Sequence, residues 1–325
     1  MKSSRQKDFN DLKNIVYKLN KVDECMLCGN KMSSACKSHT IPKFVLKNIA
    51  EDGKLVYGQE FANVKNLFDC KKGVSNAHVF RLICAKCDDA YFKCYENKDF
   101  ILNYNQFDLS KRNRCLSSIA VKSQLSAINV NMFVGTLRKL AYPNRVTFSF
   151  EDVDIAERRC NIDMLKKKRN SPNEEFVILY NSLLDYKLGF ATQAPIALYR
   201  DFNDNIMFDN HSLEVNNIDY LYLVVFPDEE KTRVMLYVSK DYINLKTKAF
   251  VYDFLSYSEE EKLHIIFVMM IMYTEQFFMS PSVYDKISKD KVIRKLYIKT
   301  DTDGNYPSVF KELRNYKKYN NYFKC

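Results

Sequence analysis

Four zones of hydrophobic patterning divide the 325-residue chain. Residues 1–22 carry apolar side chains at intervals of three and four, from Phe9 to Leu19, which predicts an amphipathic helix. A cysteine-rich block over residues 23–105 lacks this period and predicts a compact module. Helical spacing returns over residues 106–171, most clearly at 115–141 before Pro143, and predicts a helical connector. Its charged part, residues 151–171, is a surface helix or a loop.

From residue 172 to residue 325 the pattern indicates an antiparallel sheet with helices. LYLVVF and TRVMLYV flank a polar stretch at residues 227–231 and predict a β-hairpin. Ser258 and Glu261 form a capping-box pattern that opens a helix, which we extend to about Met279. The expected fold class is therefore α+β. The other strand candidates are FVILY, PIALYRDF, IMFD and KLYIKT.

The composition and the N-terminal sequence indicate the cellular compartment in which we expect the protein. Apolar residues make up 46% of the chain, enough for a sizeable core. The first 20 residues lack the apolar stretch of a secretory leader. The most apolar run, residues 265–273, is far shorter than the roughly 20 residues that a membrane span needs. We therefore expect a cytoplasmic protein with no membrane partner, in which clustered cysteines bind metal rather than form disulfides.

A net charge of +10 is compatible with nucleic acid as a partner. Two basic stretches, at residues 158–169 and 286–324, could follow a phosphate backbone, and the second adds Tyr and Phe rings for base stacking. An ordinary solvated surface gives the same pattern. Nucleotide-binding loops and serine-hydrolase elbows are missing from the sequence.

Two Cys-x-x-Cys pairs predict a structural zinc site formed by Cys25, Cys28, Cys84 and Cys87. Gly29 follows the first pair, as in a knuckle whose backbone N–H groups face the sulfurs. The second pair precedes a plausible helix start. A knuckle, a hairpin and a second pair at a helix N-terminus describe a treble-clef zinc finger.

A smaller ligand set is also open. Cys36 and His39 closely follow the first pair, so Cys25, Cys28, Cys36 and His39 could form a compact site by themselves. That set leaves the second Cys-x-x-Cys pair without a role. We expect the remaining cysteines to be small apolar fillers or free thiols.

The residues between the pairs carry a resemblance to a known family. Ser38–Pro42 reads SHTIP, and the second pair lies in LICAKCDDAYFKCYE. With the first pair, this order resembles HNH-type nucleases of the ββα-metal class. It is most similar to bacterial HNH-like proteins with an SHxIP motif, some of which are associated with anti-phage defence. The resemblance covers residues 23–100 and implies an HNH-like treble-clef module over residues 23–105.

The resemblance implies a catalytic centre. His39 matches the general base that activates water, and Asp88 matches a ligand of a catalytic Mg²⁺ or Mn²⁺. The family usually has Asp directly before the base, whereas this chain has Ser38. The middle Asn of the pattern is missing near Val79, and Asn76 and His78 lie close enough in sequence to substitute for it with a shift in register.

Other roles for these residues stay open. His39 could instead bond a backbone carbonyl, contact phosphate or bind zinc. Glu96 could share a divalent cation with Asp88, or it could pair with a basic side chain such as Lys43 or Lys47.

The function expected from these observations is metal-dependent cleavage of nucleic-acid phosphodiesters, with DNA favoured over RNA, in bacterial anti-phage defence. A partner protein of a defence system fits the same expectation. The first alternative is a zinc-finger protein that binds nucleic acid without cleaving it. The second is a protein–protein adaptor that docks a partner on an apolar, Met-rich C-terminal surface.

Overall fold

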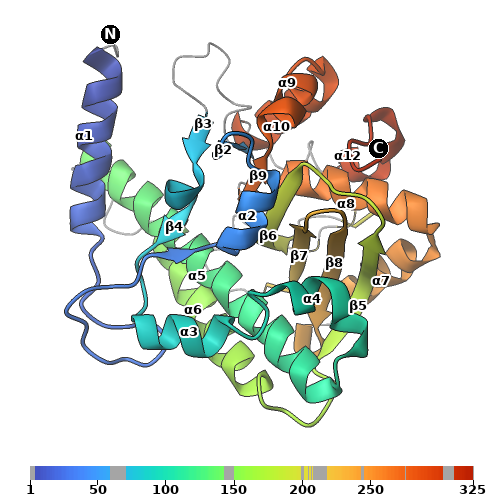
Figure 1. Ribbon diagram of the computed structural model, residues 1–325, viewed down its shortest axis with the longest axis horizontal. Coiled ribbons are helices and arrows are strands. Elements are labelled where there is room, and N and C mark those ends of the chain that lie inside the picture. The colour runs from blue at the N-terminus through green and yellow to red at the C-terminus, as the bar shows by residue number, and fades with distance from the viewer. Residues whose placement is uncertain are drawn as a thin grey trace.

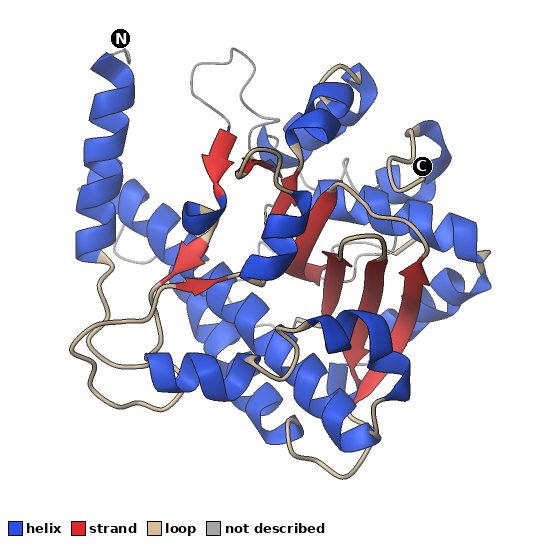
Figure 2. Cartoon of the chain, viewed as in Figure 1, coloured by secondary structure: helices blue, strands red, loops and turns tan. Residues whose placement is uncertain are grey.

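A computed structural model describes residues 4–58, 71–142, 150–198, 201–203, 205, 207, 218–242, 245–274, 276–302 and 311–324. Helices lie on both faces of a central sheet, and the N-terminal helix stands at one side (Figures 1 and 2). The fold class is mixed α+β, as the sequence predicts. The strand candidate IMFD and the stop at Pro143 lie wholly or largely outside the described residues.

Helices and strands alternate irregularly along the chain. The α-helices are α1 (Ser4–Leu19), α2 (Lys43–Ile49), α3 (Ala85–Phe92), α4 (Lys98–Asn103), α5 (Leu109–Ala141), α6 (Phe150–Lys168), α7 (Leu245–Ser256), α8 (Glu259–Tyr273), α9 (Pro281–Ile287), α10 (Lys291–Thr302) and α12 (Lys311–Arg314). The strands are β1 (Ser38–His39), β2 (Lys54–Tyr57), β3 (Lys71–Gly73), β4 (Val79–Phe80), β5 (Phe176–Leu184), β6 (Phe190–Ala197), β7 (Tyr220–Pro227), β8 (Thr232–Ser239) and β9 (Phe277–Met279).

Two antiparallel sheets are present among the described residues. The larger has seven strands in the order β3-β2-β9-β6-β7-β8-β5. The smaller pairs β1 with β4, so that His39 lies opposite Val79. The predicted hairpin is confirmed, because β7 pairs with β8 around the polar turn.

Both faces of the large sheet are buried. In β7, Tyr222 and Val224 pack in one core with α5, while Leu221, Leu223 and Val225 pack in a second core with α8. Successive side chains of a strand point to opposite faces, so one strand can serve both cores. The helices α5 and α8 therefore form the outer layers of a three-layer arrangement.

The large sheet runs across the boundary that the sequence suggested between residues 23–105 and 172–325. Strand β2 pairs with β9, with Val56 opposite Met279. The buried guanidinium of Arg233 in β8 donates from Nε to the carbonyl of Ile101 in α4 at 2.9 Å. The cysteine-rich region is thus attached to the C-terminal sheet by backbone and side-chain bonds.

Three predictions about the C-terminal half had different outcomes. Ser258 and Glu261 form the predicted capping box at the start of α8. That helix ends at Tyr273 rather than near Met279, because residues 277–279 form β9 between β2 and β6. KLYIKT belongs to helix α10 and not to a strand.

The long helix α5 has 33 residues and crosses the molecule diagonally, with its C-terminal end beside α1 (Figure 1). Residues 115–128 of this helix are buried on all sides, by α6, α3 and β6. The charged segment that follows forms α6 rather than a loop. Helix α1 is present as predicted, but Leu12, Ile15 and Leu19 stay exposed while Val16 is buried.

Among the residues that the structure describes, no helix has both the length and the apolar character needed to cross a lipid bilayer.

The junction of β2 and β9 leads to a stability prediction. A Cβ atom added at Gly58 would lie 2.4 Å from Cε1 of Phe277, whose buried ring cannot move freely. We expect Gly58→Ala to lower the free energy of unfolding by about 1–3 kcal/mol through overpacking. Denaturant unfolding monitored by circular dichroism measures the change.

Gly73→Ala is the matched control. A Cβ atom at Gly73 meets none of the described residues within 4 Å, and the residue has φ −69°. This substitution should leave the unfolding midpoint nearly unchanged. Equal effects of the two substitutions would argue against a tight junction between β2 and β9.

Candidate metal centre

Two distant cysteine pairs meet at the start of α3. The Sγ atoms of Cys25, Cys28, Cys84 and Cys87 all lie within 4.8 Å of one another. Four sulfurs at about 2.3 Å from one zinc ion would lie about 3.8 Å apart, so a small inward movement completes a tetrahedral site. The predicted four cysteines therefore form a cluster that can hold a metal ion such as zinc.

Local backbone geometry places each pair. The turn after Cys25 is closed by Gly29, whose N–H bonds the Cys25 carbonyl at 2.8 Å and whose φ of +72° suits glycine. Cys84 is the N-cap residue of α3, and its sulfur accepts from the N–H of Cys87 at 3.4 Å. The N–H of Cys84 in turn donates to the sulfur of Cys25 at 3.3 Å. Backbone donors thus connect the two pairs directly.

The electrostatics of the cluster favour a cation. Burial by itself raises the pKa of Cys25, but backbone N–H groups of Cys84, Cys28 and Leu27 outweigh it and lower that pKa to about 7. Burial and the neighbouring thiols raise the pKa of Cys87. A bound dication would release the remaining thiol protons, because metal ligands are thiolates.

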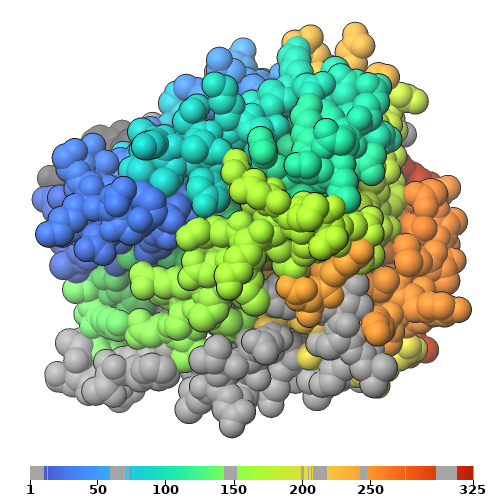
Figure 3. Space-filling model, turned by 90° about the horizontal axis from the view of Figure 1, so that it is seen from below, coloured from blue at the N-terminus to red at the C-terminus, as the bar shows by residue number. Residues whose placement is uncertain are grey.

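Helix α6 covers one side of the first turn. Figure 3 shows this helix crossing the surface beside the N-terminal region. Lys166 donates from Nζ to the carbonyl of Leu27 at 3.1 Å. The turn is thereby attached to the helical layer as well as to α3.

The smaller ligand set is wrong for the described residues. Cys36 and His39 do not belong to the sulfur cluster. Cys36 instead contacts Asp88: burial raises the pKa of the Cys36 thiol, and the charge and hydrogen bond of Asp88 raise it further.

Strand β1 sorts the expected catalytic residues onto two faces. Ser38 donates from Oγ to Oδ1 of Asp88 at 2.5 Å, and Thr40 bonds Ser126 of α5 at 2.8 Å. Both side chains are buried. Because neighbours along a strand alternate, His39 lies on the opposite face from Ser38 and Asp88.

The His39 ring is held by backbone and surrounded by positive charge. It is half-buried and bonds the Val74 backbone, while its Nε2 atom is buried and has no hydrogen-bond partner in the part of the chain that the structure describes. Burial lowers the pKa of His39, and the ammonium groups of Lys122, Lys43 and Lys37 lower it further against the opposing Val74 bond. The ring is therefore neutral at pH 7. With Nδ1 donating to the carbonyl, the lone pair is on Nε2.

His78 lies beneath the same short sheet. Its Nδ1 is 2.7 Å from Oγ1 of Thr40 and 3.4 Å from Oγ of Ser126, and its ring packs on Tyr57 with centroids 5.3 Å apart. The residue adopts a φ of 35°, which is unusual for a residue other than glycine. Thr40 thus ties His78 to the strand that carries His39.

At the position expected for a catalytic Mg²⁺ or Mn²⁺, hydrogen-bond donors lie where the ion would need oxygen ligands. Asp88 accepts from Ser38, and Nζ of Lys122 lies 4.0 Å from the same carboxylate. Lys122 also bonds Glu96. Glu96 therefore pairs with a basic side chain, as one of the two alternatives predicted, but the partner is Lys122 and not Lys43 or Lys47. An ammonium group and a hydroxyl donor beside the carboxylate do not fit a hard dication, which needs several oxygen ligands.

Sequence reasoning missed two features of this region. In the sequence, Lys122 is only a single cation within a helical apolar pattern, and nothing there indicates that it is buried or which carboxylates it pairs with. Cys94 and Cys115 are free thiols in contact: Cys115 Sγ lies 3.4 Å from the Cys94 carbonyl oxygen, and the Cys115 thiol lowers the pKa of Cys94 to about 7. Their separation of 21 positions hides this contact.

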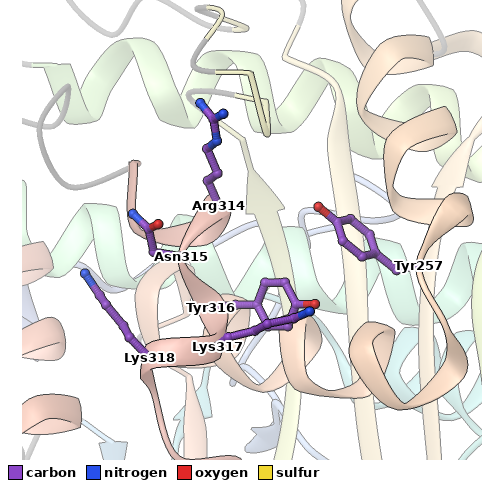
Figure 4. A pocket seen from close by; sticks show the side chains of 6 residues that line it. All are labelled: Tyr257, Arg314, Asn315, Tyr316, Lys317 and Lys318. Carbon is purple, nitrogen blue, oxygen red and sulfur yellow. The ribbon is translucent and has the colours of Figure 1, made fainter.

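The C-terminal tail differs from the expected stacking surface. Tyr316, Tyr319 and Phe323 are buried, so they cannot stack on bases. The tail does form a pocket of about 480 Å³ with cationic side chains on one wall and Tyr257 on the other (Figure 4). The pocket-lining residues are Tyr257, Arg314, Asn315, Tyr316, Lys317 and Lys318.

The cluster predicts one zinc ion per chain. Cys25→Ser removes a buried sulfur, so we expect zinc content measured by elemental analysis to fall from about one per chain toward zero. The free energy of unfolding should drop by more than about 4 kcal/mol, the range typical of a lost metal site. Cys160→Ser is the control, because Cys160 is exposed and outside the cluster. Equal zinc content in both variants would contradict the site.

His39 makes a pH prediction. Its pKa in the folded chain lies below the ordinary value of about 6.5, so the unfolded chain binds more protons as pH falls through that range. We expect the ring resonance of His39 to titrate below pH 6.5 by NMR, and His39→Asn to reduce the acid sensitivity of stability. A titration midpoint above 6.5 would show that a carboxylate, and not the lysines, dominates the ring's surroundings.

Comparison with protein-family models, with curated proteins and with solved structures found no match to this chain.

Proposed function

We propose that the chain acts on the phosphodiester backbone of nucleic acid, with DNA favoured over RNA, through an HNH-like module. In this proposal the four-cysteine cluster is a structural zinc site in a treble-clef arrangement. The sulfur cluster at the N-terminus of α3 supports the zinc site. The spacing of the cluster from SHTIP supports the HNH-like assignment.

One observation carries the proposal. His39 has a neutral ring whose buried Nε2 atom has no hydrogen-bond partner among the described residues, and the Lys43 and Lys37 ammonium groups lie near it. In this proposal, water and substrate reach Nε2 when the side chains that cover it move. A phosphodiester is an anion, so lysines around the ring favour its approach. A neutral imidazole nitrogen can take a proton from water while the water oxygen attacks phosphorus and the bond to the leaving oxygen breaks.

The lysines supply the charge that this reaction needs. Negative charge develops on the phosphoryl oxygens during attack, and fixed cations stabilise it. Lys43 begins α2 directly after the SHTIP turn, and Lys37 directly precedes β1, so both lie next to His39 in the chain. The proposal contains no step that involves Mg²⁺ or Mn²⁺, because the donors around Asp88 do not fit such an ion.

The resemblance is also the basis for the cellular setting. We propose action in bacterial anti-phage defence, in the cytoplasm and with a partner protein of the same system. The Met-rich run gives the adaptor alternative no docking surface, since Met269, Met270 and Met272 of α8 are buried in the core.

A second candidate function is binding of nucleic acid without cleavage. The bond between Ser38 and Asp88 favours it, because the two positions at which the resemblance implies metal ligands meet and bond each other. A net charge of +10 supports binding in either case.

His39→Asn separates the two functions. The asparagine amide can still donate to the Val74 carbonyl, but it removes the Nε2 atom, so the fold is kept and the base is lost. We expect the variant to bind DNA like wild type in a salt-dependent gel shift and to lose about 10²–10⁴-fold in plasmid nicking rate.

Each other result has a definite meaning. Equal nicking by both proteins would show that His39 is not the base. A gel shift with no nicking by wild type would establish the binding function instead. If the protein neither binds nor nicks DNA or RNA, the proposed function is overturned.

A further inference from the structure

Lys122 is a buried cation at the junction of α3 and α5. Its side chain is only 2% exposed, and its Nζ bonds Oε1 of Glu96 and lies 4.0 Å from Oδ1 of Asp88. The ammonium group also lies 4.4 Å from the centre of the Phe92 ring. A lysine is rarely buried to this extent unless it is paired, and here its partners are two carboxylates.

The surroundings of Asp88 complete the arrangement. Its carboxylate accepts from the hydroxyl of Ser38 at 2.5 Å, and the thiol of Cys36 is a further hydrogen-bond partner. Asp88 is 27% exposed and Glu96 is 29% exposed, so solvent reaches both carboxylates but scarcely reaches the ammonium group. The positive charge is therefore fixed behind the carboxylates by α5 and not supplied from solution.

We propose that the Lys122 ammonium group takes the place of the hard divalent cation that an HNH-like module would hold between Asp88 and its neighbours. The inference rests on the HNH-like module of the proposed function for the location of that cation. It follows that wild-type protein loaded with zinc binds no Mg²⁺ or Mn²⁺ at Asp88.

Charge and space both support this exchange. A dication at Asp88 needs oxygen ligands at about 2.0–2.2 Å and cannot share that volume with a hydroxyl donor and an ammonium group. Lys122 cannot swing into solvent to make room, because the middle of α5 is buried on all sides. If Lys122 is removed, two carboxylates lose their counter-charge and repel each other, which a dication would relieve.

The test measures Mn²⁺ binding by electron paramagnetic resonance of full-length, zinc-loaded protein. Wild type should leave the signal of free Mn²⁺ unchanged. Lys122→Met keeps the length and the apolar contact of the side chain but removes the charge. We expect this variant to bind about one Mn²⁺ per chain and to gain thermal stability when Mn²⁺ is added.

A double variant is the matched control. Lys122→Met with Glu96→Gln leaves a single carboxylate, so Mn²⁺ binding should fall at least about tenfold relative to Lys122→Met alone. If Lys122→Met is unfolded without metal, recovery of its near-ultraviolet circular dichroism on Mn²⁺ addition, and not on addition of NaCl, gives the same support.

Two results would overturn the inference. One is stoichiometric Mn²⁺ binding by wild type that Asp88→Asn abolishes. The other is a Lys122→Met variant that does not respond to Mn²⁺. If the variant is folded, it fails to bind Mn²⁺; if it is unfolded, it fails to recover its structure when Mn²⁺ is added. These measurements contain no nucleic acid, so their failure leaves the role of His39 untouched. The nicking and gel-shift experiments likewise do not change the Mn²⁺ binding expected of wild type and of Lys122→Met, so the two failures can be told apart.

Discussion

The meeting of two cysteine pairs at the N-terminus of α3 is the constraint on which the region around β1 and β4 depends. Cys84 both caps α3 and donates its N–H to the sulfur of Cys25, so the first turn and the helix are fixed relative to each other. Strands β1 and β4 lie between the pairs in sequence, and three residues separate the end of β4 from Cys84. The N–H of Cys36 also bonds the carbonyl of Ile83 at 2.7 Å, so the segment before β1 is attached next to Cys84. The cysteine junction and the two-residue pairing of β1 with β4 together position Ser38 and His39.

Helix α5 is the second element that the region needs. Its polar side chains have partners on several sides: Gln124 donates to the hydroxyl of Tyr222 in the sheet at 3.1 Å, and Ser126 bonds Thr40 after β1 at 2.8 Å. The carbonyl of Leu116 accepts from the hydroxyl of Tyr237 at 2.8 Å. Buried polar groups are costly unless they are paired, so these contacts select one arrangement of helix, sheet and cysteine-rich region.

Most predictions from short stretches of sequence are confirmed, with KLYIKT as an exception, whereas most contacts between distant residues gave no signal in the sequence. The hairpin of β7 and β8 and the capping box at Ser258 depend on neighbouring residues and are correct. Residues 277–279 are apolar and follow the helical apolar run after three polar residues, yet they pair with β2 and β6, which lie far away in sequence. The cysteine cluster was predictable because thiolate spacing is diagnostic. The pairing of Glu96 with Lys122 was not, because a charge inside a helical pattern does not indicate its partner.

The length of α5 has a consequence for how this protein can vary. Lys122 and Ser126 are four residues apart, so they lie on one face and meet Asp88 and Thr40 respectively. Deleting or inserting one residue upstream in the helix would rotate that face by about 100° and shift it by about 1.5 Å. Both contacts would be lost together, although every side chain that makes them would still be present. Indels within the first half of this helix should therefore be far rarer among natural variants than conservative substitutions at the same positions.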